Sequence, residues 1–269
     1  MKTINQFTAY NSINSFLADM RQYDGYSWGS MGGDTYWYAS QSYDEAEERA
    51  IAGDVELSKM VRAYDKLSVN IPSTCTRMRR MVAAIAGIAP HVPNYIAGVP
   101  TNMIRCKKEE RIEKKIINVC YANNVRDDGT SVEDVAKVSA RVLSCILSLE
   151  RKGYRVNLYA ANAARNNHVN GRPVAGFCVK LKDAGQHRDL AKVAMPLLSA
   201  AWNRRFGFRY REACGWTKSS NMGSTIHGSE LRAYLDKNGF KYDVAFGFYD
   251  AQRLQTVEEL ENLFLNSKK

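Results

Sequence analysis

A polar loop in the middle of the chain carries side chains that could bind a metal ion. It follows the apolar stretch IINVCYANN (116–124) and contains Asp127, Asp128 and Ser131. Oxygen atoms of such residues are the preferred ligands of Mg²⁺ and Ca²⁺, so the three are candidate metal ligands. Alternatively, the loop ends in a helix N-cap, where Ser131 accepts a backbone hydrogen bond and acidic residues favour the helix dipole. The capping pattern favours this second interpretation.

A basic and aromatic stretch, WNRRFGFRYREACGWTK (202–218), is the strongest sign of a binding function. Arginine neutralises phosphate and aromatic rings stack on unpaired bases, so the mixture predicts a nucleic-acid-binding surface. The candidate residues are Arg204, Arg205, Phe208, Arg209, Tyr210, Arg211, Trp216 and Lys218, with Arg77, Arg79 and Arg80 as an extension. The alternatives are that the rings belong to the core and that the extension pairs with the acidic segment EAEE.

Other catalytic patterns are missing from the sequence. The six cysteines form no C-x-x-C pair, and the four histidines form no H-x-x-x-H spacing, so we expect reduced thiols and no structural zinc. Neither G-x-G-x-x-G nor a P-loop motif follows the central strand pattern. We therefore predict no cofactor and lean against an enzyme.

Composition sets the class of protein. The chain has 269 residues, 45% of them hydrophobic, and a net charge of +10, which fits a globular protein with affinity for polyanions. No apolar run approaches the roughly 18 residues of a membrane span, and the first residues lack the apolar core of a signal peptide. We expect a cytoplasmic protein with no membrane partner.

The second half of the chain alternates between strand and helix patterns. Residues 116–122 predict a buried strand, residues 130–153 a long amphipathic helix and residues 154–163 a second strand. This order forms a βαβ unit with parallel strands. A strand at 171–184, a helix at 189–207, a strand at 242–251 and a closing helix from Thr256 follow. We predict a three-layer α/β domain with a mainly parallel sheet over residues 111–269.

The first half is less regular. Residues 1 to about 40 are rich in Tyr, Ser and Gly and predict an arm. Ser42 and Glu45 form a capping-box pattern before a helix, and a second helix follows at 54–66. Pro93 and Pro100 indicate a turn-rich connector. We predict that residues 1–110 are an N-terminal arm with a helical and loop-rich extension.

The order of elements and the long first helix resemble a von Willebrand factor A-like domain. In that family the first strand ends in an Asp-x-Ser-x-Ser metal motif, whereas Asn118 or Asn123 stands in place of the Asp here. The resemblance implies a degenerate, Rossmannoid domain without its metal site. Ligands of open α/β sheets bind beyond the carboxyl ends of the strands, so this edge is where we expect a ligand.

Two motifs, SYDEAEERAIAG (42–53) and VPNYIAGVPTNM (92–103), resemble a family of uncharacterised tailed-bacteriophage proteins. The match spans most of residues 40–215 and departs from the family pattern at His91 and Val99. The resemblance implies a phage source, with the host bacterial cytoplasm or the virion as the setting.

Three functions follow from these observations. The first is a non-enzymatic phage protein that binds nucleic acid, or a nucleic-acid-bound protein, through the basic and aromatic surface. The second is a virion or protein-interaction component that binds a phage or host protein. The third is a metal-dependent nuclease that uses Asp127 and Asp128.

Overall fold

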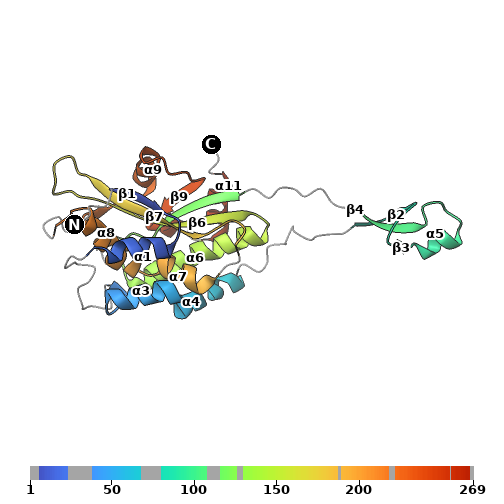
Figure 1. Cartoon of the computed structure of the whole chain (residues 1–269), viewed down its shortest axis with the longest axis horizontal. Helices are drawn as coiled ribbons and strands as arrows, with labels where there is room; N and C mark the ends of the chain where they lie inside the picture. The colour runs from blue at the N-terminus through green and yellow to red at the C-terminus, as the bar shows by residue number, and fades with distance from the viewer. Residues whose placement is uncertain are drawn as a thin grey trace. The chain divides into compact units, whose positions relative to one another are not determined.

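The computed structural model describes the chain in segments that form two compact units. The larger unit comprises residues 1–71 and 116–269, and the smaller unit comprises residues 72–115. Figure 1 shows the elements of both units. The described segments are 6–23, 38–67, 80–107, 116–125, 130–186, 189–217, 222–254 and 256–266.

A mixed, mostly parallel sheet forms the centre of the larger unit. Its strands are β1 (Phe7–Tyr10), β5 (Ile116–Ala122), β6 (Arg155–Arg165), β7 (Val174–Lys182), β8 (Ser224–Thr225) and β9 (Val244–Gly247). They are ordered β1-β7-β6-β5-β9, with β8 paired to β6. The β1–β7, β5–β6 and β5–β9 pairs are parallel, whereas β6 is antiparallel to β7 and β8. The predicted α/β class is confirmed.

Helices surround this sheet (Figure 1). They are α1 (Ile13–Arg21), α3 (Tyr43–Ala52), α4 (Val55–Leu67), α6 (Val132–Arg151), α7 (Leu190–Leu198), the π-helix η2 (Trp202–Gly207), α8 (Phe208–Ala213), α9 (Gly228–Lys237), α10 (Phe248–Arg253) and α11 (Val257–Asn266). The predicted caps are confirmed. The side chains of Ser42, Ser131 and Thr256 each accept a hydrogen bond from the backbone amide three residues later. Across the described segments, no helix has the length and apolarity to span a bilayer.

Alternation along β5 divides the core between the two faces of the sheet. Val119 and Tyr121 belong to the larger cluster, which includes residues of α1, α3, α6, α7 and η2. Cys120 and Ala122 belong to the smaller cluster, together with Leu231 and Leu235 of α9. Because successive side chains of a strand point to opposite faces, both faces are covered by helices.

The structure divides the chain differently from the predicted boundary at residue 110. Strand β1 pairs with β7 in register Tyr10 to Val179, and Phe16 of α1 stacks on Phe177 with ring centroids 4.5 Å apart. The first 71 residues therefore belong to the α/β unit, and residues 72–115 are an insertion within it. Sequence spacing could not reveal this, since the β1–β7 pairing is long-range.

Two predicted elements are shorter than expected. The helix predicted over 189–207 ends at Leu198, because Ser199 adopts an extended conformation, and the chain resumes as the π-helix η2. The strand predicted over 242–251 ends at Gly247, and α10 begins at Phe248. In both cases the apolar run in the sequence extends beyond the residue at which the backbone conformation changes. The hydrophobic pattern alone therefore overestimated the length of the element.

The smaller unit is a three-stranded antiparallel sheet with one short helix. Its elements are β2 (Arg80–Ala84), β3 (Ala89–Pro90), α5 (Val92–Ile96) and β4 (Met103–Lys107). The central strand is β4, with β2 and β3 on its two sides. The turn-rich character predicted around Pro93 and Pro100 is confirmed, since α5 has only five residues and Pro93 lies in its first turn.

Candidate functional site

The carboxyl end of β5, where a ligand was expected, is closed by a side chain. The Asn123 amide nitrogen lies 2.9 Å from the Ser199 carbonyl oxygen, 3.1 Å from that of Leu197 and 3.3 Å from that of Pro196. Asn123 is 1% exposed. An amide donor thus holds the loop after α7 at the position where a metal-binding carboxylate was considered.

The other residues considered for a metal site do not gather at this edge. Asn118 lies toward the opposite end of β5, where its backbone and side-chain nitrogens donate to Asp243. Ser131 caps α6, as the alternative interpretation stated. Asp127 and Asp128 lie outside the described residues. Within the described segments, no group of three or more His, Cys, Asp or Glu is arranged to hold a metal ion.

The predicted basic and aromatic surface is wrong in its placement, because most of these side chains are buried. Arg204, Arg205 and Arg211 are 1%, 0% and 1% exposed. Trp216 and Tyr210 are buried as well. The helices η2 and α8 pack this stretch against the sheet, so both the rings and the arginines lie inside the larger unit.

Neutral oxygen atoms contact the buried guanidinium groups of Arg205 and Arg211, and an aromatic ring contacts that of Arg205. The Arg205 guanidinium lies 3.9 Å from the Tyr38 ring centroid, and its Nε donates to Ser40 Oγ at 3.0 Å. The Arg211 Nη2 donates to Oδ1 of Asn162 at 2.7 Å and of Asn203 at 2.8 Å. Burial lowers the pKa of Arg205 and lowers that of Arg211 to about 9. These contacts give the arginines a structural role.

The remaining candidates of the predicted nucleic-acid site are placed in different ways. Arg209 is half-buried, lies 4.2 Å from the Tyr43 ring centroid and donates to the Tyr23 carbonyl. Phe208 is half-buried too. Lys218, Arg77 and Arg79 lie outside the described residues, and Arg80 begins β2 of the smaller unit.

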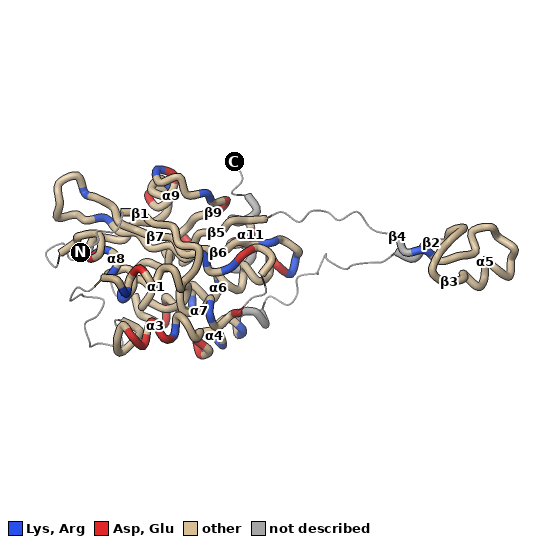
Figure 2. The backbone as a smooth tube through the Cα atoms, in the orientation of Figure 1, with Lys and Arg blue, Asp and Glu red and all other residues tan. Residues whose placement is uncertain are grey.

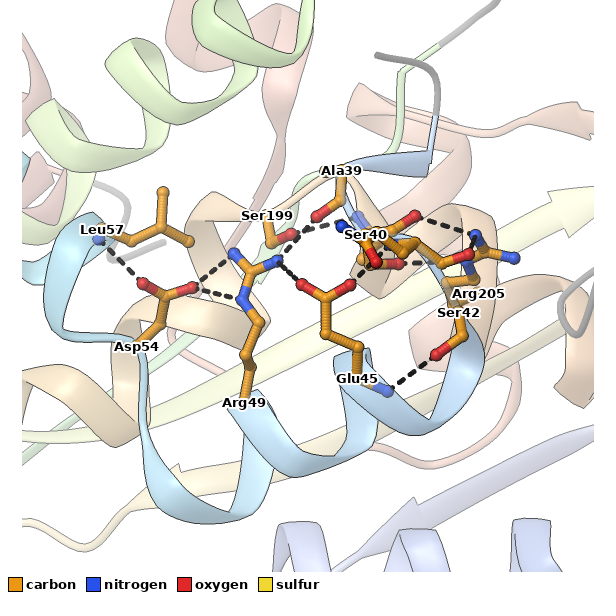
Figure 3. A network of polar contacts seen from close by, with 11 residues as sticks. Ala39, Ser40, Ser42, Glu45, Arg49, Asp54, Leu57, Ser199 and Arg205 are labelled. Carbon is orange, nitrogen blue, oxygen red and sulfur yellow. Dashed lines mark hydrogen bonds and ion pairs between the residues drawn. The ribbon is translucent and has the colours of Figure 1, made fainter. Parts of the chain in front are cut away.

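A hollow of about 250 Å³ lies beside the loop that Asn123 holds, lined by residues that include Ser40, Glu45, Arg49, Leu57, Val132 and Ser199. Figure 3 shows the polar network along it. Arg49 bonds to Asp54 and donates to the Ala39 carbonyl at 2.7 Å. Glu45 accepts from the Gln41 backbone at 2.6 Å. These charged groups are hydrogen-bonded to other groups of the same chain. The network therefore stabilises α3 and the start of α4.

The smaller unit exposes the strongest apolar surface of the described chain. We define the apolar tip as residues 81–104, which contain no Lys, Arg, Asp or Glu. Six of the ten exposed large hydrophobic residues belong to it: Ile85 (78%), Ile88 (75%), Val92 (57%), Tyr95 (67%), Ile96 (79%) and Val99 (37%). Exposed apolar side chains gathered in one small unit indicate an interaction site, so the apolar tip is the candidate functional site.

Cations border the apolar tip. Arg80 and Lys107 occupy paired positions on β2 and β4, and Arg105 is exposed nearby on β4. We define these three residues as the basic neck; Figure 2 shows no Lys, Arg, Asp or Glu along the tip. Sequence reasoning missed this site although its signal, an uncharged run of 24 residues between arginines, was present, because residues 91–104 were interpreted as a connector.

Comparison with known proteins gives one match. A family model described as a domain of unknown function (DUF7192) matches residues 2–259. No curated protein and no solved structure matches the chain.

Proposed function

The chain belongs to the DUF7192 family of domains of unknown function, and we propose that its role is docking. The α/β unit carries an insertion whose apolar tip is buried in the surface of a partner. The observation that carries this proposal is the exposure of Ile85, Ile88 and Ile96 on a unit without a buried apolar residue among those described. The protein acts as a binding component and catalyses no reaction in this proposal.

The free energies of burial and association require several side chains of the apolar tip to enter the partner together. Burying one large aliphatic side chain stabilises a contact by roughly 1.5–3 kcal/mol. Association costs roughly 4–15 kcal/mol of lost freedom, so several of the six exposed side chains must enter the partner together. Their grouping in one stretch of 24 residues makes this possible.

Retention on an octyl matrix in a descending salt gradient tests the docking surface. The variant carrying Ile85→Ser and Ile96→Ser should elute clearly earlier than the wild type, because it loses two of the most exposed apolar side chains. The matched control carries Ile51→Ser and Val55→Ser, which are exposed on α3 and α4, and should elute close to the wild type. Equal retention of the tip variant and the wild type would remove the tip from the account.

We also propose that the α/β unit is a degenerate von Willebrand factor A-like domain. Three features support the proposal: β5 lies inside the sheet, the long helix α6 follows it, and Asn123 fills the strand end. A domain of this kind presents binding surfaces without metal chemistry at its strand end. Titration of the purified protein with Mg²⁺, followed by thermal unfolding, should leave the melting temperature unchanged.

Nucleic-acid binding is the second candidate function. It is supported by the net charge of +10 and by Arg77, Arg79 and Arg80, which precede the apolar tip. Anisotropy of labelled single-stranded DNA, duplex DNA and RNA over a salt series tests it, because phosphate contacts give a steep salt slope. Replacing the three arginines by Gln should flatten that slope, and absence of binding at low salt would exclude this candidate.

A tailed-phage source, with a bacterial cytoplasm or a virion as the setting, completes the proposal. It is supported by the two motifs at 42–53 and 92–103. The motif at 92–103 contains α5 and residues 97–103, which follow α5 in the apolar tip. Mass spectrometry of purified virions and of infected-cell extracts would locate the protein.

A further inference from the structure

The insertion combines an apolar surface with a net positive charge, since residues 72–115 contain nine Lys or Arg and three Glu, which are Glu109, Glu110 and Glu113. From Lys66 to Lys108 the sequence has no Asp or Glu, whereas it has Lys66, Arg77, Arg79, Arg80, Arg105, Lys107 and Lys108. All of these cations lie outside the apolar tip. A partner that covers the tip and the residues next to it must therefore offer apolar material to the tip and negative charge to its border.

The register of the small sheet places two of the cations at matching positions. Arg80 of β2 pairs with Lys107 of β4 in the antiparallel ladder. The basic neck is therefore a place where negative charge from a partner would stabilise the unit.

Several backbone polar groups of the apolar tip are hydrogen-bonded within it. The Ile88 amide donates to the Ile104 carbonyl at 2.8 Å, and the His91 amide donates to the Asn102 carbonyl at 2.7 Å. The Asn94 side chain donates to the Thr101 carbonyl at 2.8 Å. Unpaired backbone groups are what excludes irregular segments from an apolar medium, so these bonds lower the cost of moving the tip out of water.

These properties discriminate between partners. A second copy of the chain would bring two basic necks together and would face repulsion. Nucleic acid supplies phosphate but has no apolar interior that could take up Ile85, Ile88 and Ile96. The surface of an anionic bilayer supplies both parts, since acyl chains lie directly beneath charged headgroups.

We propose that the apolar tip inserts into the surface of an anionic lipid bilayer while the basic neck contacts the lipid phosphates. This inference rests on the proposed docking function and names its partner. It also revises the expectation of no membrane partner, because a peripheral tip needs no spanning helix. Tyr95, with an apolar ring and a polar hydroxyl, suits the boundary between headgroups and acyl chains.

Flotation of the full-length protein with vesicles tests the proposal. One set of vesicles contains equal parts phosphatidylglycerol and phosphatidylcholine, and the other contains phosphatidylcholine alone. The wild type should partition at least about tenfold more strongly onto the anionic vesicles, since each basic residue near such a surface strengthens binding several-fold. Arg80→Gln with Lys107→Gln should remove most of this preference.

The Ile85→Ser and Ile96→Ser variant should lose at least about tenfold of the partition onto anionic vesicles, whereas the Ile51→Ser and Val55→Ser control should match the wild type. Binding that depends on salt but not on Ile85 and Ile96 would overturn insertion. If the wild type is retained on the octyl matrix through its tip but does not float with either vesicle, the lipid proposal fails while docking stands. A protein with an acid-rimmed apolar groove would then be the partner.

Discussion

The side-chain amide of Asn123 donates to the backbone carbonyl of Ser199 over 2.9 Å, which ties the carboxyl end of β5 to the loop after α7. The same nitrogen also lies within hydrogen-bond distance of Pro196 and Leu197 carbonyls. The position requires a donor, because three carbonyl oxygens converge on it.

Asn123→Asp should therefore destabilise the protein by about 2–4 kcal/mol, because a buried carboxylate would face carbonyl oxygens without a donor. Urea unfolding followed by circular dichroism measures the change in free energy. Asn170→Asp is the control for added charge, since Asn170 is exposed between β6 and β7, and it should behave like the wild type. An Asn123→Asp variant as stable as the wild type, or one stabilised by Mg²⁺, would contradict the structural role of Asn123.

Arg205→Ala should lower stability and leave polyanion binding unchanged. Its guanidinium is buried against Tyr38 and donates to both the hydroxyl and the carbonyl of Ser40. Removing it leaves these groups without their donor and opens a cavity, which costs about 2–4 kcal/mol. Thermal unfolding measures the loss, and anisotropy below the melting temperature measures binding. Weaker binding with unchanged stability would place Arg205 on a functional surface instead.

Gly207→Ala tests the close packing of η2 on the sheet. A Cβ atom at this position would lie 2.7 Å from Nδ2 of Asn162, a side chain held by Arg211. Since Asn162 cannot move without breaking that bond, we expect a loss of about 1–3 kcal/mol. Gly185→Ala is the matched control, because nothing lies within 4 Å of its Cβ position. Equal stability of the two variants would show that the space at Gly207 is larger than described.

The buried thiol of Cys214 contributes a free energy of unfolding that decreases at alkaline pH. Burial raises the pKa of its thiol from the ordinary 9.0 to about 12. The folded state thus keeps a proton that the unfolded state releases, so its contribution is complete below about pH 9 and is lost as the pH rises toward 12. Urea unfolding between pH 8 and 11 should show a smaller decline for Cys214→Ala than for the wild type. Parallel declines would contradict this contribution.

Local signals were sufficient for much of the fold. The caps Ser42, Ser131 and Thr256 each act within three residues of their position, and the long helix at 132–151 follows from its amphipathic pattern. The alternation of strands and helices was therefore sufficient to predict the α/β class.

Long-range contacts explain what sequence reasoning missed. Arg205 is buried because it meets Ser40, 165 positions earlier in the chain, and spacing within 202–218 contains no information about that contact. The pairing of β1 with β7 places residues 1–71 in the α/β unit. Only this pairing shows that residues 72–115 are an insertion. Within this insertion, the described apolar residues of the tip are not buried.

The most direct test of docking places an environment-sensitive dye at the tip of the full-length protein. In a background in which Cys75, Cys106 and Cys214 are replaced by Ala, Ile96→Cys is labelled with a nitrobenzoxadiazole dye, and Asn170→Cys, exposed in the larger unit, is labelled as the reference. Both labels should emit as in water in the free protein, and neutral maltoside micelles should shift only the emission of the label at position 96 to the blue. Emission from position 96 that is already blue-shifted in the free protein, or that ignores the micelles, would contradict an uncovered docking surface.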